Sequence, residues 1–213
     1  MGVWVEDEFS WVGPEWKRDL RYLPDTLVTQ VSLHHEKLGL LLKCRDIVDY
    51  QENIYLREIS VENTVSRPRE IRLFFHQDFN ISGNDVGDTA VFDPLNEAIV
   101  HYKGSRYFLV NGCIKGKRGL FQFAVGQKGI GGREGTFRDA EDGLLSGNPI
   151  AQGSVDSVIA LRLQTNGEAK GYAYFWMAAG RTWNEVRALN GLVQSEGPEN
   201  LIHRTHDYWL LWS

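Results

Sequence analysis

The sequence predicts a mainly β protein, an antiparallel two-layer β-sandwich with two helices at its C-terminal end. Stretches of alternating apolar and polar residues follow one another through Ala178 and are separated by turn signals such as 104–105 and 115–116. A helical pattern with a capping sequence begins only after residue 181. Strands at this spacing, without helices between them, favour a sandwich over a parallel α/β sheet.

The segment 70–79 is the clearest strand. Ile71, Leu73 and Phe75 have one parity, and Arg72 and His76 have the other, which is the pattern of a strand with one buried face. The same criteria predict strands over residues 3–5, 27–33, 38–46, 55–63, 70–79, 97–103, 107–114, 120–126, 154–163 and 171–178.

Two helices are expected after the strands. Thr182 and Glu185 have the spacing of a capping box, and Gly197 followed by Pro198 ends the first helix and begins the second. The second helix carries an apolar stripe that needs a partner surface, formed by Leu201, Thr205, Tyr208 and Trp212. We therefore expect a sandwich domain over residues 1–180 and a helical linker over residues 181–213.

Composition excludes several classes of partner. The chain of 213 residues has a net charge of −5 and no basic stripe, which argues against binding nucleic acid or an anionic membrane. No apolar run approaches the roughly 18 residues of a membrane helix. Cys44 and Cys113 lie in apolar strand patterns, where buried thiols are more usual than a disulfide, and we expect a cytoplasmic location.

The long connection over residues 80–96 is the first candidate interaction loop. It is too rich in Gly, Pro and Asx residues to form one regular element, and loops of this length are often functional. Asn84, Asp85 and Asp88, with Asp93 and Asn96, can either hold a hard cation such as Ca²⁺ or form Asx turns.

The second candidate interaction loop lies within residues 133–156. Arg138, Asp139, Glu141 and Asp142 are flanked by glycines, so we expect an irregular polar excursion. It either shapes the rim of a substrate pocket or is ordered internally, with Arg138 paired to a neighbouring carboxylate. Two acidic residues can also serve glycoside hydrolysis, but such clusters are common on surfaces. We assign no catalytic, cofactor-binding or metal-binding residue, and we expect no cofactor.

Several stretches carry a resemblance to a known family. They are RYLPDTLV (21–28), RLFFH (72–76), GNDVGDT (83–89), IVHYK (99–103), EGTFRDAEDG (134–143) and LSGNPIAQGSVD (145–156). In this order they resemble the N-terminal β-sandwich domain of bacterial and archaeal glycoside hydrolase family 15, the glucoamylase, glucodextranase and trehalase-like enzymes. The resemblance covers nearly the whole chain.

The resemblance implies a super-β-sandwich of the galactose-mutarotase-like kind, joined by a linker to a catalytic (α/α) barrel that carries both catalytic glutamates. We therefore expect this chain to be an N-terminally truncated piece of a glucan 1,4-α-glucosidase-like hydrolase. Its expected function is non-catalytic, packing on the downstream barrel and supporting it. Without the barrel, the piece is expected to self-associate.

The alternative function is a glucan-binding module, with Trp11 and Trp16 as stacking platforms for α-glucan.

Overall fold

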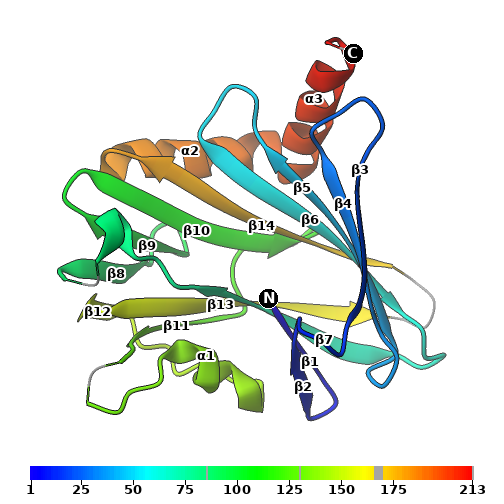
Figure 1. The fold of residues 1–213 in the computed structure, drawn as a ribbon, viewed down its shortest axis with the longest axis horizontal. Coiled ribbons are helices and arrows are strands. Elements are labelled where there is room, and N and C mark those ends of the chain that lie inside the picture. The colour runs from blue at the N-terminus through cyan, green and yellow to red at the C-terminus, as the bar shows by residue number, and fades with distance from the viewer. Residues whose placement is uncertain (85, 130, 166–169, 213) are drawn as a thin grey trace.

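A computed structural model describes residues 1–84, 86–129, 131–165 and 170–212. Two antiparallel sheets pack face to face (Figure 1), which confirms the expected sandwich. The smaller sheet has the strand order β11-β13-β7-β1-β2, and the larger has the order β12-β8-β9-β10-β14-β6-β5-β4-β3. In chain order the elements are β1 (Gly2–Val5), β2 (Glu8–Trp11), β3 (Lys17–Tyr22), β4 (Thr29–His35), β5 (Leu40–Val48), β6 (Ile54–Asn63), β7 (Arg69–Gln77), the 3₁₀ turn η1 (Ile81–Gly83), β8 (Asp88–Asp93), β9 (Ala98–Lys103), β10 (Arg106–Ile114), β11 (Gln122–Gln127), α1 (Thr136–Asp139), the 3₁₀ turn η2 (Ala140–Asp142), β12 (Ile150–Gly153), β13 (Val155–Thr165), β14 (Gly171–Gly180), α2 (Trp183–Glu196) and α3 (Pro198–Leu210).

The main core lies between the two sheets. Alternate residues of β7 point inward, as the sequence predicts, and Ile71, Leu73 and Phe75 are buried there. Phe75 stacks on Phe175 of the opposite sheet, with ring centroids 4.7 Å apart. Burying such side chains is the main favourable term in folding a sandwich of this size.

The two predicted C-terminal helices cover the outer face of the larger sheet (Figure 1). The capping residue Thr182 accepts a hydrogen bond from the backbone N–H of Glu185 at 3.2 Å, and the Glu185 carboxylate accepts one from the N–H of Arg181. Beneath the helices, Trp176 donates through Nε1 to Asn190 of α2 at 2.9 Å. No helix in the described part of the chain is long and apolar enough to cross a membrane.

Four strands were missed by the sequence patterns, namely β2, β3, β8 and β12. One of them corrects a loop prediction, because residues 133–156, the second candidate loop, were predicted to be an irregular excursion and contain α1 and β12. This segment is therefore not irregular throughout. Residues 80–96 contain η1 and β8 and so are not one regular element, as expected. These short strands gain order from pairing rather than from their own pattern, since β12 pairs with β8 and β8 with β9.

Both cysteines are thiols, as expected, with Cys44 buried and Cys113 partly buried. Burial raises the pKa of each thiol to about 11. At neutral pH both are protonated and behave as small apolar side chains.

Candidate functional site: an aromatic pocket beside β2

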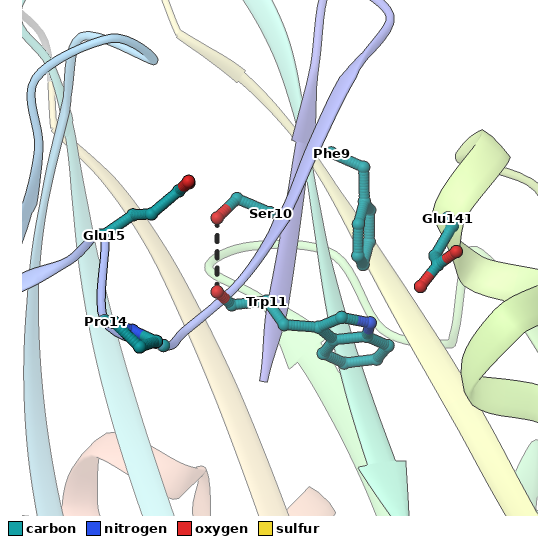
Figure 2. Close-up of a pocket in the computed structure, with 7 residues that line it drawn as sticks. Phe9, Ser10, Trp11, Pro14, Glu15 and Glu141 are labelled. Carbon is teal, nitrogen blue, oxygen red and sulfur yellow. Dashed lines mark hydrogen bonds between the residues drawn. The ribbon is translucent and has the colours of Figure 1, made fainter.

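A pocket of about 680 Å³ lies along β2, at the edge of the smaller sheet (Figure 2). It is called the β2 pocket below. Strand β2 returns from β1 through a tight turn in which Glu6 and Asp7 have φ of 53° and 64°. The residues that line the pocket are Phe9, Ser10, Trp11, Gly13, Pro14, Glu15 and Glu141.

Two aromatic rings of β2 form one side of the pocket. Phe9 and Trp11 are two residues apart, so they share a face of the strand, and their ring centroids lie 5.0 Å apart, edge to face. Behind them, Gly2 of β1 leaves room for both rings, because a Cβ at this position would lie 2.6 Å from Phe9 and 2.9 Å from Trp11. Phe74 packs against Phe9, with centroids 5.7 Å apart. The rings are thus held by the sheet behind them.

A carboxylate from a distant segment faces these rings. Figure 2 shows Glu141 pointing from the helical segment toward Phe9 and Trp11. Both oxygens of Glu141 accept hydrogen bonds from Nη1 of Arg138 at 3.1 Å, and Nε of Arg138 also lies 3.3 Å from Glu134. Glu15, on the other side of β2, lies 3.5 Å from Nε2 of His35. Each carboxylate of the pocket therefore has a cationic or ionisable neighbour.

The segment that carries Glu141 is tied to the sheet at both ends. At its start, Asp156 accepts hydrogen bonds from the N–H of Thr136 at 2.7 Å and, through the same oxygen, from Nε2 of His76 at 3.0 Å. At its end, Nη1 of Arg72 donates to the carbonyl of Gly143 at 2.8 Å. These anchors fix the distance between Glu141 and β2.

Asp156 is the buried member of this arrangement. Burial by itself would raise the pKa of Asp156, but the hydrogen bonds from His76 and from the N–H of Thr136 outweigh it and leave the pKa below its usual value. The carboxylate is consequently charged at neutral pH, and its hydrogen bonds are charge-assisted. Asp156 positions the pocket wall without lining the pocket.

Of the four predicted residues in this segment, Glu141 alone lines the pocket. Arg138 pairs with Glu141, Asp139 accepts from the N–H of Ser146 at 2.8 Å, and Asp142 accepts from the N–H of Leu144 at 2.9 Å. The sequence left two alternatives open for this segment, a rim of a substrate pocket and internal order with Arg138 paired to a neighbouring carboxylate. These contacts match internal order. A role at the rim of a larger substrate pocket stays a prediction.

The first candidate loop is closed by a lysine. Nζ of Lys103 donates to the side-chain oxygen of Asn84 at 2.7 Å and to the carbonyl of Ile81 at 3.0 Å. It also lies 3.0 Å from the buried carboxylate of Asp88, an ion pair without hydrogen-bond geometry. Asp85 lies outside the described residues.

Asx turns account for much of the polarity of this loop. Asn84 accepts from the N–H of Val86 at 3.1 Å, and Asp93 accepts from the N–H of Leu95 at 3.0 Å and from the side chain of Asn96 at 2.7 Å. Asp88 accepts from the N–H of Ile81 at 3.1 Å, which is a longer-range bond across the loop. In the described ranges, no three His, Cys, Asp or Glu side chains form a possible metal cluster. The hydrogen bonds of Asn84 and Asp93 match the turn alternative.

The two candidate loops are joined by the pairing of their strands, and their charged side chains do not pair with one another in the described part of the chain. Strand β12 pairs with β8, with Gly153 opposite Asp88. Among the residues described, no hydrogen bond or ion pair joins the charged residues 138–142 to Asn84 or Asp88. They form two separate surfaces.

Sequence reasoning missed Phe9, His76 and Asp156 and misjudged Trp16. Trp16 is 3% exposed and donates through Nε1 to Ser10 at 3.0 Å, so it cannot serve as a stacking platform. The alternation of Phe9 and Trp11 was a usable signal for β2. The contact of β2 with Glu141 is long-range and leaves no local signal.

A second feature is an exposed apolar patch, called the β3–α3 surface below. It surrounds a cleft of about 560 Å³ between the β3–β4 turn and the end of α3. Trp212 is 74% exposed and Tyr22 is 61% exposed. The large apolar residues that line the cleft are Tyr22, Leu23, Leu27, Trp209 and Trp212, and Leu20 and Leu211, close to them in sequence, are exposed.

No family model matches the chain. The sequence is 24% identical over 151 residues to an uncharacterized glycosyl hydrolase of Methanocaldococcus jannaschii, covering 70% of this chain and 23% of that protein. The chain therefore spans about a quarter of the curated relative that it matches.

Two solved structures share the fold. A bacterial glucoamylase complexed with acarbose has a TM-score of 0.77 and 11% identity, with 99% of this chain and 31% of that chain covered. A protein from human microbiome, provisionally assigned as a kojibiose phosphorylase, has a TM-score of 0.60 and 10% identity, with 98% of this chain and 26% of that chain covered. These comparisons associate the sandwich with glycoside hydrolase-related proteins without singling out family 15.

Proposed function

We propose that this chain is the non-catalytic N-terminal sandwich of a family 15 α-glucan or α-glucoside hydrolase, and that it packs on the catalytic helical barrel and supports it. The observation that carries the proposal is the β3–α3 surface. Soluble proteins rarely expose large apolar side chains in one contiguous patch, and such a patch usually marks an interaction site.

The position of the patch suits this role. Edge strands are usually protected by charge, and β3 supplies it through Lys17, Arg18 and Arg21. Leu20 and Tyr22 of the same strand are exposed nonetheless, and Tyr22 lines a cleft together with Trp209 and Trp212 at the end of α3. A partner that covers the β3–β4 turn would thus also contact the last turn of α3. In the proposal, residues 181–213 are the linker and the barrel is that partner.

Two observations favour family 15 over other glycoside hydrolases. The sequence stretches quoted above resemble this family in order along the chain, and the TM-score with the glucoamylase, 0.77, exceeds that with the phosphorylase, 0.60. In the proposal, hydrolysis belongs to the barrel, and the sandwich contributes stability and the shape of the pocket rim.

The test uses the full-length gene product and this chain side by side. Tyr22→Ser combined with Trp212→Ser should lower the melting temperature of the full-length protein, because buried apolar contact with the barrel is lost. The matched control is Leu95→Ser, which removes an 82% exposed leucine from another turn. This chain alone should not release glucose from maltotetraose, isomaltotetraose or trehalose.

Two results would overturn the proposal. One is a double variant that melts like the control. The other is turnover by this chain alone that disappears when one of its own carboxylates is replaced.

A second candidate function is a glucan-binding module. It is favoured by the position of Trp11 in the β2 pocket and weakened by the burial of Trp16. Calorimetric titration with soluble starch or dextran tests this role, and the melting of the full-length variants tests the packing role independently.

A further inference from the structure

We infer that the β2 pocket binds one or two rings of a neutral oligosaccharide, with Phe9 and Trp11 against the sugar ring and Glu141 accepting hydrogen bonds from its hydroxyl groups. This gives the second candidate function a defined site. It does not depend on the packing role, because the β2 pocket and the β3–α3 surface share no lining residue.

Size and lining fit a small polyhydroxylated ligand. The volume of about 680 Å³ lies within the range of roughly 300–1,000 Å³ that is usual for small-molecule sites. Such sites combine an aromatic lining with a few polar groups that fix orientation. A pyranose ring offers C–H groups to an aromatic face and hydroxyl groups at its edge, so it matches both parts of the lining.

The charges of the pocket favour a neutral ligand with hydrogen-bond donors. Ionised carboxylates only accept hydrogen bonds, so phosphorylated or carboxylated ligands would be repelled. Glu141 is already paired with Arg138, whose guanidinium also lies beside Glu134. A cation would therefore compete with Arg138 for Glu141, whereas a hydroxyl group can donate to a lone pair that the pairing leaves available.

The pocket is preorganised. The helical segment is fixed by Asp156 at its start and Arg72 at its end, and the rings of β2 rest on the bare backbone of Gly2. Binding of a ligand therefore costs little conformational entropy of the protein, so a small contact surface is enough for weak but specific binding.

The experiment is calorimetric titration of this chain with maltotetraose and with isomaltotetraose, with spermidine as the cationic probe. We expect millimolar binding of at least one oligosaccharide, weakened roughly fivefold or more by Glu141→Gln and by Trp11→Ala. Glu196→Gln and Trp212→Ser are the matched controls and should bind like the parent chain.

Each other outcome contradicts the inference. Absence of binding by both oligosaccharides sinks it, as does binding that Glu141→Gln leaves unchanged. Binding of spermidine in place of the sugars assigns the pocket to cations. The binding data for Trp11→Ala are used only if its melting temperature shows that the protein is folded. If it is not, the binding data for Glu141→Gln, a change at a partly exposed position, decide the test. None of these results bears on contact with a barrel, which the melting of the full-length variants tests separately.

Discussion

Arg204 of α3 forms a salt bridge with the carboxylate of Asp49, in the turn between β5 and β6. Nε and Nη2 of Arg204 lie 3.0 Å and 2.9 Å from Oδ2 of Asp49, and Nη2 lies 3.0 Å from Oδ1. The side chain of Asp49 is fully buried, and it also accepts hydrogen bonds from Thr205 and from the N–H groups of Gln51 and Glu52. One carboxylate thus fixes the direction of α3 relative to the larger sheet.

We predict that Asp49→Ala lowers the free energy of unfolding by about 2–4 kcal/mol, because several charge-assisted hydrogen bonds are lost together. Urea unfolding measures the change. Arg204→Met should cost less, since Arg204 is partly exposed and Asp49 keeps its other donors. A loss below about 0.5 kcal/mol for Asp49→Ala, the usual range of neutral surface changes, would contradict this account of the joint.

Stability should fall as the pH drops below neutrality because of His101. This side chain lies between the sheets, where its Nε2 is 2.7 Å from Oγ of Ser157, and Ser157 donates to Gln77. Burial lowers the pKa of His101 from 6.5 to about 4, with smaller and partly opposing effects of Asp156, His76 and Asp78. The unfolded chain therefore binds a proton that the folded chain does not between these two pH values.

The sign of the effect follows from this difference. The contribution of His101 is fully present above pH 6.5 and is lost as the pH falls toward 4, by about 3 kcal/mol at most. Unfolding free energies measured between pH 7 and pH 4.5 should decline less steeply in His101→Gln than in the parent chain. Parallel curves would show that His101 is not held neutral.

Trp16 should matter for stability and not for ligands. Its ring packs edge to face on His35, with centroids 4.9 Å apart, and it is buried in the main core. We predict that Trp16→Ala costs about 3–5 kcal/mol, whereas Trp212→Ala in this chain stays within about 0.5 kcal/mol. Urea unfolding measures both changes. Equal losses of unfolding free energy in the two variants would contradict the prediction, which rests on the difference in burial between the two tryptophans.

Asp156 should control local opening of the pocket wall. Replacing it by Asn removes the charge that holds Thr136 and His76, and hydrogen bonds to charged groups contribute roughly 1.5–3 kcal/mol each. Amide hydrogen exchange at residues 136–142 should accelerate by about tenfold or more. Asp142→Asn, which affects only the N–H of Leu144, is the control. Unchanged exchange in Asp156→Asn would show that the segment is held by other contacts.

The sequence predicted the parts of the fold in which the local pattern and the burial agree. Strand β7 alternates because one of its faces meets the core, and α2 starts where Thr182 caps it. Strand β3 was not predictable, since all six of its residues are exposed and carry no alternation. Strand β8 was hidden because Asp88 and Asp93, both buried, read as loop residues.

The candidate site was only partly predictable, for the same physical reason. Glu141 and Trp11 were singled out separately, by charge and by residue type. Their meeting depends on the pairing of β1 with β2 and on the contact between Asp156 and His76, residues 80 positions apart. Contacts of this range leave no trace in local periodicity.

Hydrogen exchange of this chain, compared with that of the full-length gene product, tests the central claim most directly. If the sandwich packs on a barrel through the β3–α3 surface, the amides of residues 20–27 and 208–212 should exchange more slowly in the full-length protein. Amides of the β2 strand should exchange alike in both, because this strand lies at an edge of the other sheet. Equal exchange at residues 20–27 and 208–212 in the two proteins would contradict the proposed packing role.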